Sequence, residues 1–336
     1  MQSDYDDLRF KHENAGNVYL DYWIETYDSS SASVWVQIPH IPMGDSWMYM
    51  FYGNPSTQSE SDFYSVFTDW EEKWANDEQI SYHANLEGVW DPDVCYGIDE
   101  FLVAWEEGQA FLPPYTYGFK QEIRASIYDP DGDTLVFDKL VYKDSTTYYR
   151  NENPSIAFGD GKWFVAWENY EPNNLPPHNP SSTTMDIKAR TVQRSGGNLQ
   201  LGSVKTVCSA QNCQADANVE FDSVNNRFCV VWEDARDGTN DYDIWGRLYD
   251  TDGNPVGSEV ELTENAANSQ CEPWAVFDPV NEQYLIVWEE GAIADDGPFS
   301  IKAGLFDEDL TQIDNTITIA TGNDNTDYNF PCVCFL

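Results

Sequence analysis

Four glutamates occupy equivalent places in a motif that this chain repeats. Each follows a tryptophan at the end of an apolar run: FLVAWEE, WFVAWEN, RFCVVWED and YLIVWEE. The pairs are Trp105–Glu106, Trp167–Glu168, Trp232–Glu233 and Trp288–Glu289. Symmetry-related carboxylates can bind a cation, or serve as the general acid and base of a glycosidase. The structural alternative, which we expect to be the main one, is that each Glu pairs with a basic residue on the next strand (Arg124, Lys188 or Lys302) while each Trp packs between repeats.

The loop that follows the third Trp-Glu pair is the best candidate for a metal site. Its sequence, EDARDGTNDYD, concentrates Asp234, Asp237, Asp241 and Asp243. Hard oxygen ligands gathered in a flexible loop suit Ca²⁺, although the spacing matches no EF-hand. Calcium is the one cofactor that the sequence suggests.

The loop that follows the first Trp-Glu pair is the best candidate for ligand binding. It carries Phe111, Tyr115, Tyr117 and Phe119 beside two prolines. Aromatic rings held by a stiff loop can stack on a sugar ring or contact a protein partner. The alternative is a loop that folds onto its own face.

The usual catalytic and metal templates are missing from the sequence. The four histidines form no H-E-x-x-H pattern, and there is no nucleophile elbow or phosphate loop. The seven cysteines contain no paired C-x-x-C motifs, which argues against zinc. Cys208 and Cys213 lie close enough in one loop to form a disulfide.

The elements that position these residues are short strands. A strand-like segment precedes each Trp-Glu run, an Ile-centred strand follows it, and a tight turn leads to a fourth extended stretch. Four strands in about 60 residues predict a β-propeller blade. The repeats cover residues 91–152, 153–215, 216–271 and 272–329.

The last residues, 330–336, begin the unit again. Because an open propeller leaves an unpaired edge, we expect them to share a fifth blade with residues 63–90. The all-β prediction is therefore a five-bladed propeller over residues 63–336. A stacked array of sandwiches, or a piece of a longer propeller, are the alternatives.

Charge restricts the partners. The chain has 59 acidic residues against 17 Lys and Arg, a net charge of −42. Nucleic acid and anionic membrane surfaces are therefore poor partners. No apolar stretch is long enough to predict a transmembrane helix, and the first residues lack a signal peptide's apolar core. If the protein is exported, its signal has been removed or lay upstream.

Residues 1–62 predict a separate antiparallel, sandwich-like β segment. The motifs DDLRF, LDYWIETY, SVWVQIP and MYMFYGNPS occur in this order. This order resembles an uncharacterised domain of archaeal and bacterial surface proteins, with D-I-R-F, Y-W-I-E, V-W-V-K-I-P and Y-M-Y-Y-G-N-P motifs, over residues 4–56. The resemblance implies an exported, multidomain envelope or extracellular protein, and it brings no catalytic residue. Strands that precede D-I-R-F in that family are missing here, so the segment packs on the repeats or receives strands from a partner chain.

Residues 79–336 resemble, more loosely, the Trp-Glu-containing propeller-like repeats of large secreted proteins. Together these features predict an extracellular or cell-surface module that is not an enzyme. Adhesion, surface-layer or filament assembly, or glycan binding would be its role, with self-assembly or surface glycans as its partners. The alternative is a propeller-type glycoside hydrolase or lyase that uses carboxylates on the loop face.

Overall fold

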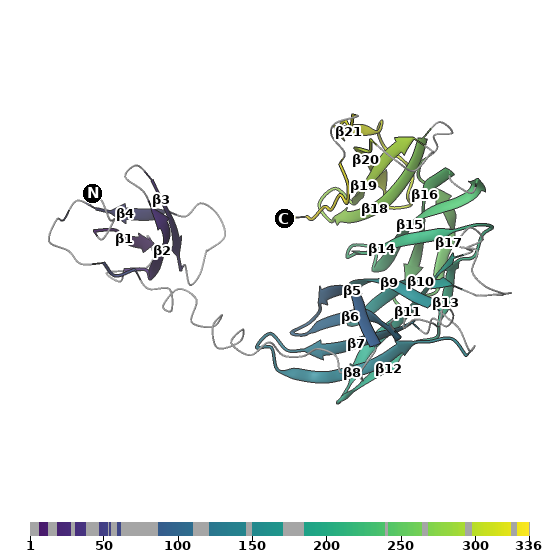
Figure 1. The fold of residues 1–336 in the computed structure, drawn as a ribbon, viewed down its shortest axis with the longest axis horizontal. Coiled ribbons are helices and arrows are strands. Elements are labelled where there is room, and N and C mark those ends of the chain that lie inside the picture. The colour runs from purple at the N-terminus through teal and green to yellow at the C-terminus, as the bar shows by residue number, and fades with distance from the viewer. Residues whose placement is uncertain are drawn as a thin grey trace, which may run out of the picture. The chain divides into compact units, whose positions relative to one another are not determined.

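The protein is all-β over the part of the chain that its structure describes, and no helix occurs there (Figure 1). The structure is a computed structural model. It describes residues 7–12, 19–27, 31–37, 47–52, 54, 59–61, 87–109, 121–145, 150–170, 185–238, 241–263, 268–292, 298–323 and 328–335. The chain divides into two compact units, Met1–Gln79 and Ile80–Leu336.

The N-terminal unit contains two antiparallel strand pairs among its described residues. In one, β1 (Arg9–His12) pairs with β4 (Met48–Phe51); in the other, β2 (Tyr22–Tyr27) pairs with β3 (Ala32–Val36). Its buried core is small and consists of Leu8, Phe10, Leu20 and Tyr22. All of β4 is exposed, so a strand made of Met, Tyr and Phe faces solvent.

The described residues of the second unit form four antiparallel sheets, one for each Trp-Glu repeat. The first has β5 (Glu87–Tyr96), β6 (Phe101–Gln109), β7 (Gln121–Tyr128) and β8 (Thr134–Tyr142). The second has β9 (Arg150–Gly159), β10 (Lys162–Tyr170), β11 (Met185–Ser195), β12 (Asn198–Leu201) and β13 (Lys205–Cys208). The third has β14 (Gln214–Asp222), β15 (Arg227–Gly238), β16 (Asp241–Asp250) and β17 (Pro255–Glu261). The fourth has β18 (Asn268–Asp278), β19 (Gln283–Ala292), β20 (Ser300–Asp307) and β21 (Ile317–Ala320).

The all-β repeat is thereby confirmed as one antiparallel sheet for each Trp-Glu run, with four strands in three sheets and five in the second, while a closed ring is not formed by the described residues. Figure 1 shows the four sheets one after another along an arc, from β5–β8 to β18–β21. One boundary is corrected: Glu87–Trp90 belong to β5 and pair with β6, so they are part of the first sheet and not of a fifth. Residues 62–86 lie outside the described residues.

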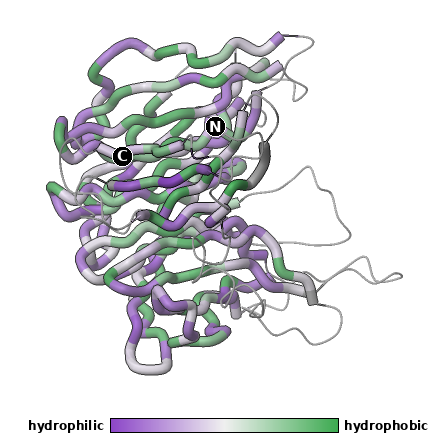
Figure 2. Tube along the Cα trace, turned by 90° about the vertical axis from the view of Figure 1, so that its left-hand side faces the viewer, coloured by the Kyte–Doolittle hydropathy of each residue, from purple (hydrophilic) through white to green (hydrophobic). Residues whose placement is uncertain are grey.

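The repeated tryptophans fill the space between sheets, as the sequence predicts. Trp105, Trp167, Trp232 and Trp288 are each at most 1% exposed. Trp167, Trp232 and Trp288 belong to apolar clusters that each draw side chains from two neighbouring sheets. Alternation of side chains along each strand makes this possible, and Figure 2 shows hydrophobic and hydrophilic residues mixed along the same strands.

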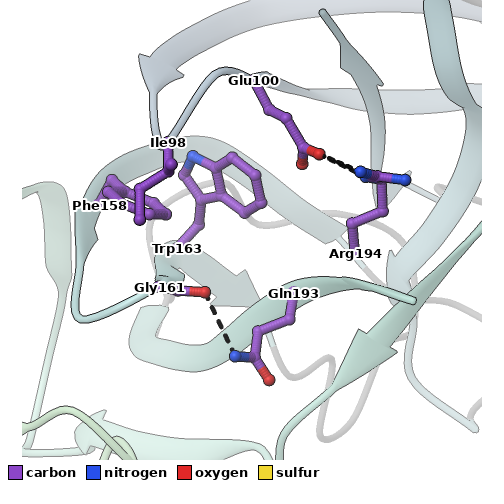
Figure 3. A pocket seen from close by; sticks show the side chains of 7 residues that line it. All are labelled: Ile98, Glu100, Phe158, Gly161, Trp163, Gln193 and Arg194. Carbon is purple, nitrogen blue, oxygen red and sulfur yellow. Dashed lines mark hydrogen bonds and ion pairs between the residues drawn. The ribbon is translucent and has the colours of Figure 1, made fainter. Parts of the chain in front are cut away.

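The four sheets have two distinct ends. We call the end where Glu106 lies the loop end, and the opposite end, with the short turns after β5 and β7, the turn end. At the turn end, ion pairs join neighbouring sheets: Glu100 to Arg194 at 2.5 Å (Figure 3), Lys162 to Asp252 at 2.5 Å, and Arg227 to Asp309 at 3.3 Å.

Candidate carboxyl site at the loop end

The glutamate of each repeat binds the backbone of the next sheet. A carboxylate oxygen of Glu168 accepts a hydrogen bond of 2.9 Å from the N–H of Asp216, and one of Glu233 accepts from Glu272 N–H at 3.2 Å. Glu106 accepts in the same way from Asn153. Glu289 accepts from Phe330, whose segment thus has the place of a next first strand. We call this repeated contact the glutamate latch.

The donors of the latch share an unusual backbone conformation. Asp91, at the equivalent position of the first sheet, has a φ angle of 45°, and the donors Asn153, Asp216, Glu272 and Phe330 have φ angles between 47° and 55°. The register of the first strand shifts at the first four of these positions, as in a β-bulge. Asp and Asn tolerate the left-handed region better than most residues, which suits the acidic and amide side chains found here. The bulge leaves an N–H unpaired within its own sheet, and the glutamate supplies its partner.

The predicted cross-strand ion pairs of these glutamates are not formed. In the observed register Glu106 lies opposite Ile123, while Arg124 lies opposite Trp105. Arg124 therefore points to the other face of the sheet, where it pairs with Glu122 and Asp138, both at 2.5 Å. Lys302 likewise pairs with Glu290 and not with Glu289.

Burial makes the latch carboxyls weak acids. It raises the pKa of Glu106 to about 7, with Glu152 and Asp91 adding to the effect. Burial also raises the pKa of Glu168 to about 8, and the charge of Asp216 contributes. The pKa of Glu233 is raised well above its ordinary value by burial and by Asp216. These groups can hold a proton at neutral pH.

Three acidic residues are linked between the third and fourth sheets. Asp216 and Glu233 share a side-chain hydrogen bond, and Glu233 accepts from the backbone of Glu272. Glu233 is buried, whereas Asp216 and Glu272 are half-buried and reachable from solvent. Burial, together with the charges of Asp216 and Glu289, raises the pKa of Glu272 to about 7. Neighbouring carboxyls of which one keeps its proton are the groups that acid–base catalysis needs.

The sequence pointed to only one of these three residues. Glu233 was marked by its repeat, while Asp216 and Glu272 open the segments DANVEF and EPWAVF, which looked like plain strand starts. Both lie within the first strand of their unit, at its bulge, and the recurrence of a polar residue at this place in every repeat is the signal that could have found them.

The four aspartates proposed for calcium do not form one group. Asp237 and Asp243 come together with Glu261, with ligand oxygens within 4.8 Å of one another. Asp241 is not in this group. Three carboxylate ligands fit the chemistry of a Ca²⁺ site, so the candidate site changes its composition and gains Glu261, at the end of β17.

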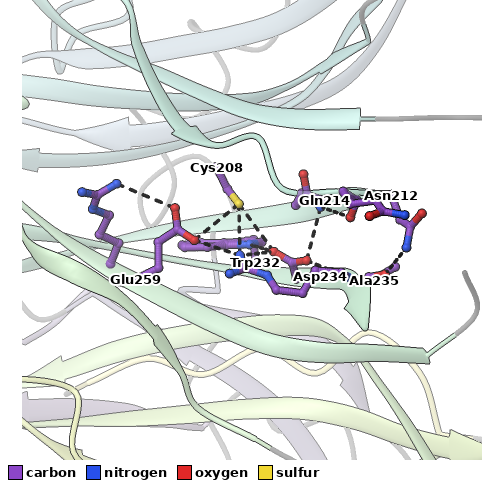
Figure 4. A network of polar contacts seen from close by, with 10 residues as sticks. Cys208, Asn212, Gln214, Trp232, Asp234, Ala235 and Glu259 are labelled. Atoms are coloured by element: carbon purple, nitrogen blue, oxygen red, sulfur yellow. Dashed lines mark hydrogen bonds and ion pairs between the residues drawn. The ribbon is translucent and has the colours of Figure 1, made fainter. Parts of the chain in front are cut away.

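Asp234 belongs instead to a polar network between β13, β15 and β17 (Figure 4). It accepts from Trp232 Nε1 at 2.9 Å and pairs with Arg236 at 2.6 Å. Arg236 also pairs with Glu259 and lies 3.6 Å from the ring centroid of Trp245. Because the carboxylate of Asp234 already has a hydrogen-bond donor and an ion-pair partner, we assign Asp234 a structural role.

The Cys208–Cys213 disulfide is not formed. Both cysteines are free and buried, as Cys208 lies in the network around Asp234 and Cys213 packs near Tyr242. Burial raises the pKa of each thiol to about 12. The two thiols are therefore poor nucleophiles at neutral pH.

The proposed aromatic ligand site lies outside the described residues. This concerns Phe111, Tyr115, Tyr117 and Phe119. A search for membrane-crossing helices among the described residues found none.

Comparison with known proteins covers the two units differently. Residues 4–90 match the family described as "Domain of unknown function (DUF2341)". No curated protein matches the chain.

Several solved structures are similar to the chain at low identity. The endo-arabinase of Bacteroides thetaiotaomicron is 11% identical with a TM-score of 0.43, over 69% of this chain and 81% of that one. The α-L-arabinanase of Penicillium chrysogenum, complexed with arabinobiose, is 15% identical with a TM-score of 0.44, over 66% and 65%. A family 117 glycoside hydrolase of Zobellia galactanivorans is 10% identical with a TM-score of 0.44, over 71% and 74%.

These findings correct the expectation of a non-catalytic adhesion or assembly module, because the similar structures named here are glycoside-processing enzymes. Likeness at this level assigns no activity by itself, so the function of this chain has to rest on its own carboxyl groups. The family match over residues 4–90 is to a domain of unknown function and therefore names no activity either.

Proposed function

We propose that the chain is a glycoside hydrolase whose active site lies at the loop end, between the third and fourth sheets. One observation carries the proposal: Glu233 bonds to the side chain of Asp216 and to the backbone N–H of Glu272, and both of these partners are reachable from solvent. Glycoside hydrolysis needs two carboxyl groups, one protonated and one ionised.

The three carboxyls have different roles in this proposal. Glu272, with its raised pKa, donates a proton to the oxygen of the scissile glycosidic bond as that bond breaks. Asp216, when ionised, stabilises the positive charge that develops at the anomeric carbon, and water then adds its hydroxyl to that carbon and returns its other proton to Glu272. Glu233 is a positioning residue, because it fixes both partners through hydrogen bonds.

The test compares purified wild type with Asp216→Asn and Glu272→Gln on a panel of plant and algal polysaccharides, with reducing-end release as the measurement. Loss of either catalytic carboxyl is expected to lower kcat by about 100-fold or more. Wild-type activity should also fall as the pH rises above about 7, since Glu272 then loses its proton.

Matched controls lie at the turn end. Asp160 and Glu282 also have positive φ angles, of 50° and 54°. Asp160→Asn and Glu282→Gln make the same chemical changes in the same backbone conformation, and we expect them to keep full activity. Equal activity in Asp216→Asn and Asp160→Asn would refute the site, and a wild type inactive on every glycan would refute the function.

We also propose that residues 328–335 begin a fifth unit that closes the array into a five-bladed propeller. The latch from Glu289 to Phe330 and the φ of 55° at Phe330 support this, since both repeat the first-strand geometry of the other sheets. Glu289→Ala should then lower the unfolding midpoint as much as the same change at Glu168. A midpoint equal to that of wild type would contradict it.

The cellular location follows as a proposal from the substrate. A hydrolase for glycans, with a strongly acidic chain, would act outside the cell or at its surface. Fractionation of the source cells with an antibody to this chain would test this, and a purely cytoplasmic signal would contradict it.

A further inference from the structure

The turn end of the second sheet departs from the pattern of the other three. In those sheets an aspartate begins the turn after the third strand: Asp129, Asp250 and Asp307. Its Oδ1 accepts backbone N–H groups two and four residues further on, at 2.7 to 3.0 Å. Gln193 has this place in the second sheet. There β11 continues through Arg194 to Ser195 and pairs with β12 around Gly196 and Gly197.

As a result, the side chains of Gln193 and Arg194 do not bond to the turn and make other contacts. Gln193 donates to the carbonyl of Gly161 at 3.2 Å, and Arg194 reaches the first sheet, where it pairs with Glu100. The partner of Trp163 across the strands is Val192, whereas the equivalent pairs in the other sheets join two aromatic rings. A smaller partner and a longer hairpin leave space beside Trp163.

The space is a hollow of about 180 Å³ between the first and second sheets. Figure 3 shows Trp163 at its centre, with Ile98 and Phe158 on one side and the Glu100–Arg194 pair on the other. Gly97 allows this close packing, because an added Cβ would lie 2.7 Å from Phe158 and 2.8 Å from Trp163. The hollow thus has an apolar wall and a rim of one carboxylate, one guanidinium and one amide.

We infer that this hollow binds a single neutral sugar ring. Its apolar wall suits the C–H face of a sugar, and the rim offers both acceptors and donors for vicinal hydroxyls. The charges of Glu100 and Arg194 balance, which favours a neutral ligand over a charged one. The volume is below that of a drug-sized pocket and suits one ring rather than a chain. The site lies at the end opposite the proposed catalytic carboxyls, so it goes beyond that function and would hold a glycan without cleaving it.

The test is saturation-transfer NMR on the full chain with the methyl glycosides of xylose, galactose and glucose, which need no catalytic turnover. Wild type should give a signal with at least one of them, with a Kd on the order of 1 mM. Gln193→Tyr, which fills the hollow, should reduce the signal at least tenfold. Gln312→Tyr makes the same change at an exposed position after β20, away from the hollow, and should bind as wild type does.

Two results would overturn the inference. One is an equal signal from wild type and a folded Gln193→Tyr variant, which circular dichroism would verify. The other is binding of glucuronate without binding of any neutral glycoside, because it would mean that the rim selects a charge.

Discussion

The two ends of the four sheets join their neighbours by opposite chemistry. At the loop end, buried glutamates with raised pKa bind the backbone of the next sheet. At the turn end, charged side chains pair across the same gaps, and aspartates bind their own turns. One repeat thus holds its neighbours with nearly neutral acids at one end and with ion pairs at the other. Only the first kind leaves protons available at neutral pH.

The largest expected effect that separates the ends is the pH dependence of stability. The latch carboxyls have higher pKa values in the folded chain than in the unfolded one, so folding takes up protons between pH 4.5 and about 8. The stability that these raised pKa values contribute to the folded chain is fully present below about pH 4.5 and is lost as the pH rises toward 8. The unfolding midpoint should therefore be higher at pH 5 than at pH 8, as measured by calorimetry.

A double variant checks the origin of that slope. Glu168→Gln with Glu233→Gln keeps the acceptor oxygens and removes the titration, so the midpoint should vary less with pH. A slope as steep as that of wild type would assign the effect to other groups.

Removal of one latch should cost the next largest amount. Glu233→Ala leaves the N–H of Glu272 without its partner and should lower the free energy of unfolding by about 3 kcal/mol. Glu233→Gln should cost less than about 1 kcal/mol, because an amide oxygen still accepts the bond. Urea unfolding measures both, and similar losses in the two variants would argue against the latch.

Calcium offers a second way to neutralise acids at the loop end. If Asp237, Asp243 and Glu261 bind Ca²⁺, an excess of 100 times Kd should stabilise the fold by about 2.7 kcal/mol. Thermal unfolding with calcium and with chelator measures this. Asp241→Asn should keep the response while Asp243→Asn loses it, and an unchanged midpoint in wild type would dismiss the site.

A buried ion pair at the turn end should matter less than a latch. Arg227 bonds to Asp222 at 3.0 Å, and Asp222 is fully buried. Arg227→Met should cost about 2 kcal/mol, because Asp222 keeps the N–H groups of Val224 and Asn225. A loss larger than that of Glu233→Ala would reverse the ranking of the two ends.

The smallest effect is expected for an exposed pair at the same end. Lys162 contacts Asp252, whose side chain is 74% exposed. Lys162→Met should change stability by no more than about 0.5 kcal/mol, and by less in high salt. A loss near that of Arg227→Met would contradict this.

The sequence predicted what depends on period and alternation. The four-stranded units and the buried tryptophans follow from hydrophobic runs that recur with every unit, and these are confirmed. The partner of the glutamates could not be predicted in the same way, because a shift of one residue in register exchanges the two faces of a sheet. Arg124 lies opposite Trp105 and not Glu106, and this single step separates the expected ion pair from the observed latch.

Contacts between distant segments were also beyond the sequence. Glu261 joins Asp237 and Asp243 only because β16 and β17 are paired, and no spacing rule marks it. Glu272 meets Glu233 because a bulge turns its N–H group toward that carboxylate, while Asp216, at the bulge of its own sheet, reaches Glu233 through its side chain. Bulges depend on how whole strands fit together, so local propensity gives little warning of them.

The latch has a direction. The donor lies within a first-strand segment, the acceptor lies toward the end of the second strand of the preceding sheet, and each therefore has a fixed neighbour. A duplicated unit would therefore arrive with both halves of its own connection, ready to fit between existing copies without altering either. Growth of the array by gene duplication would need no new interface chemistry, and geometry alone would limit the number of units.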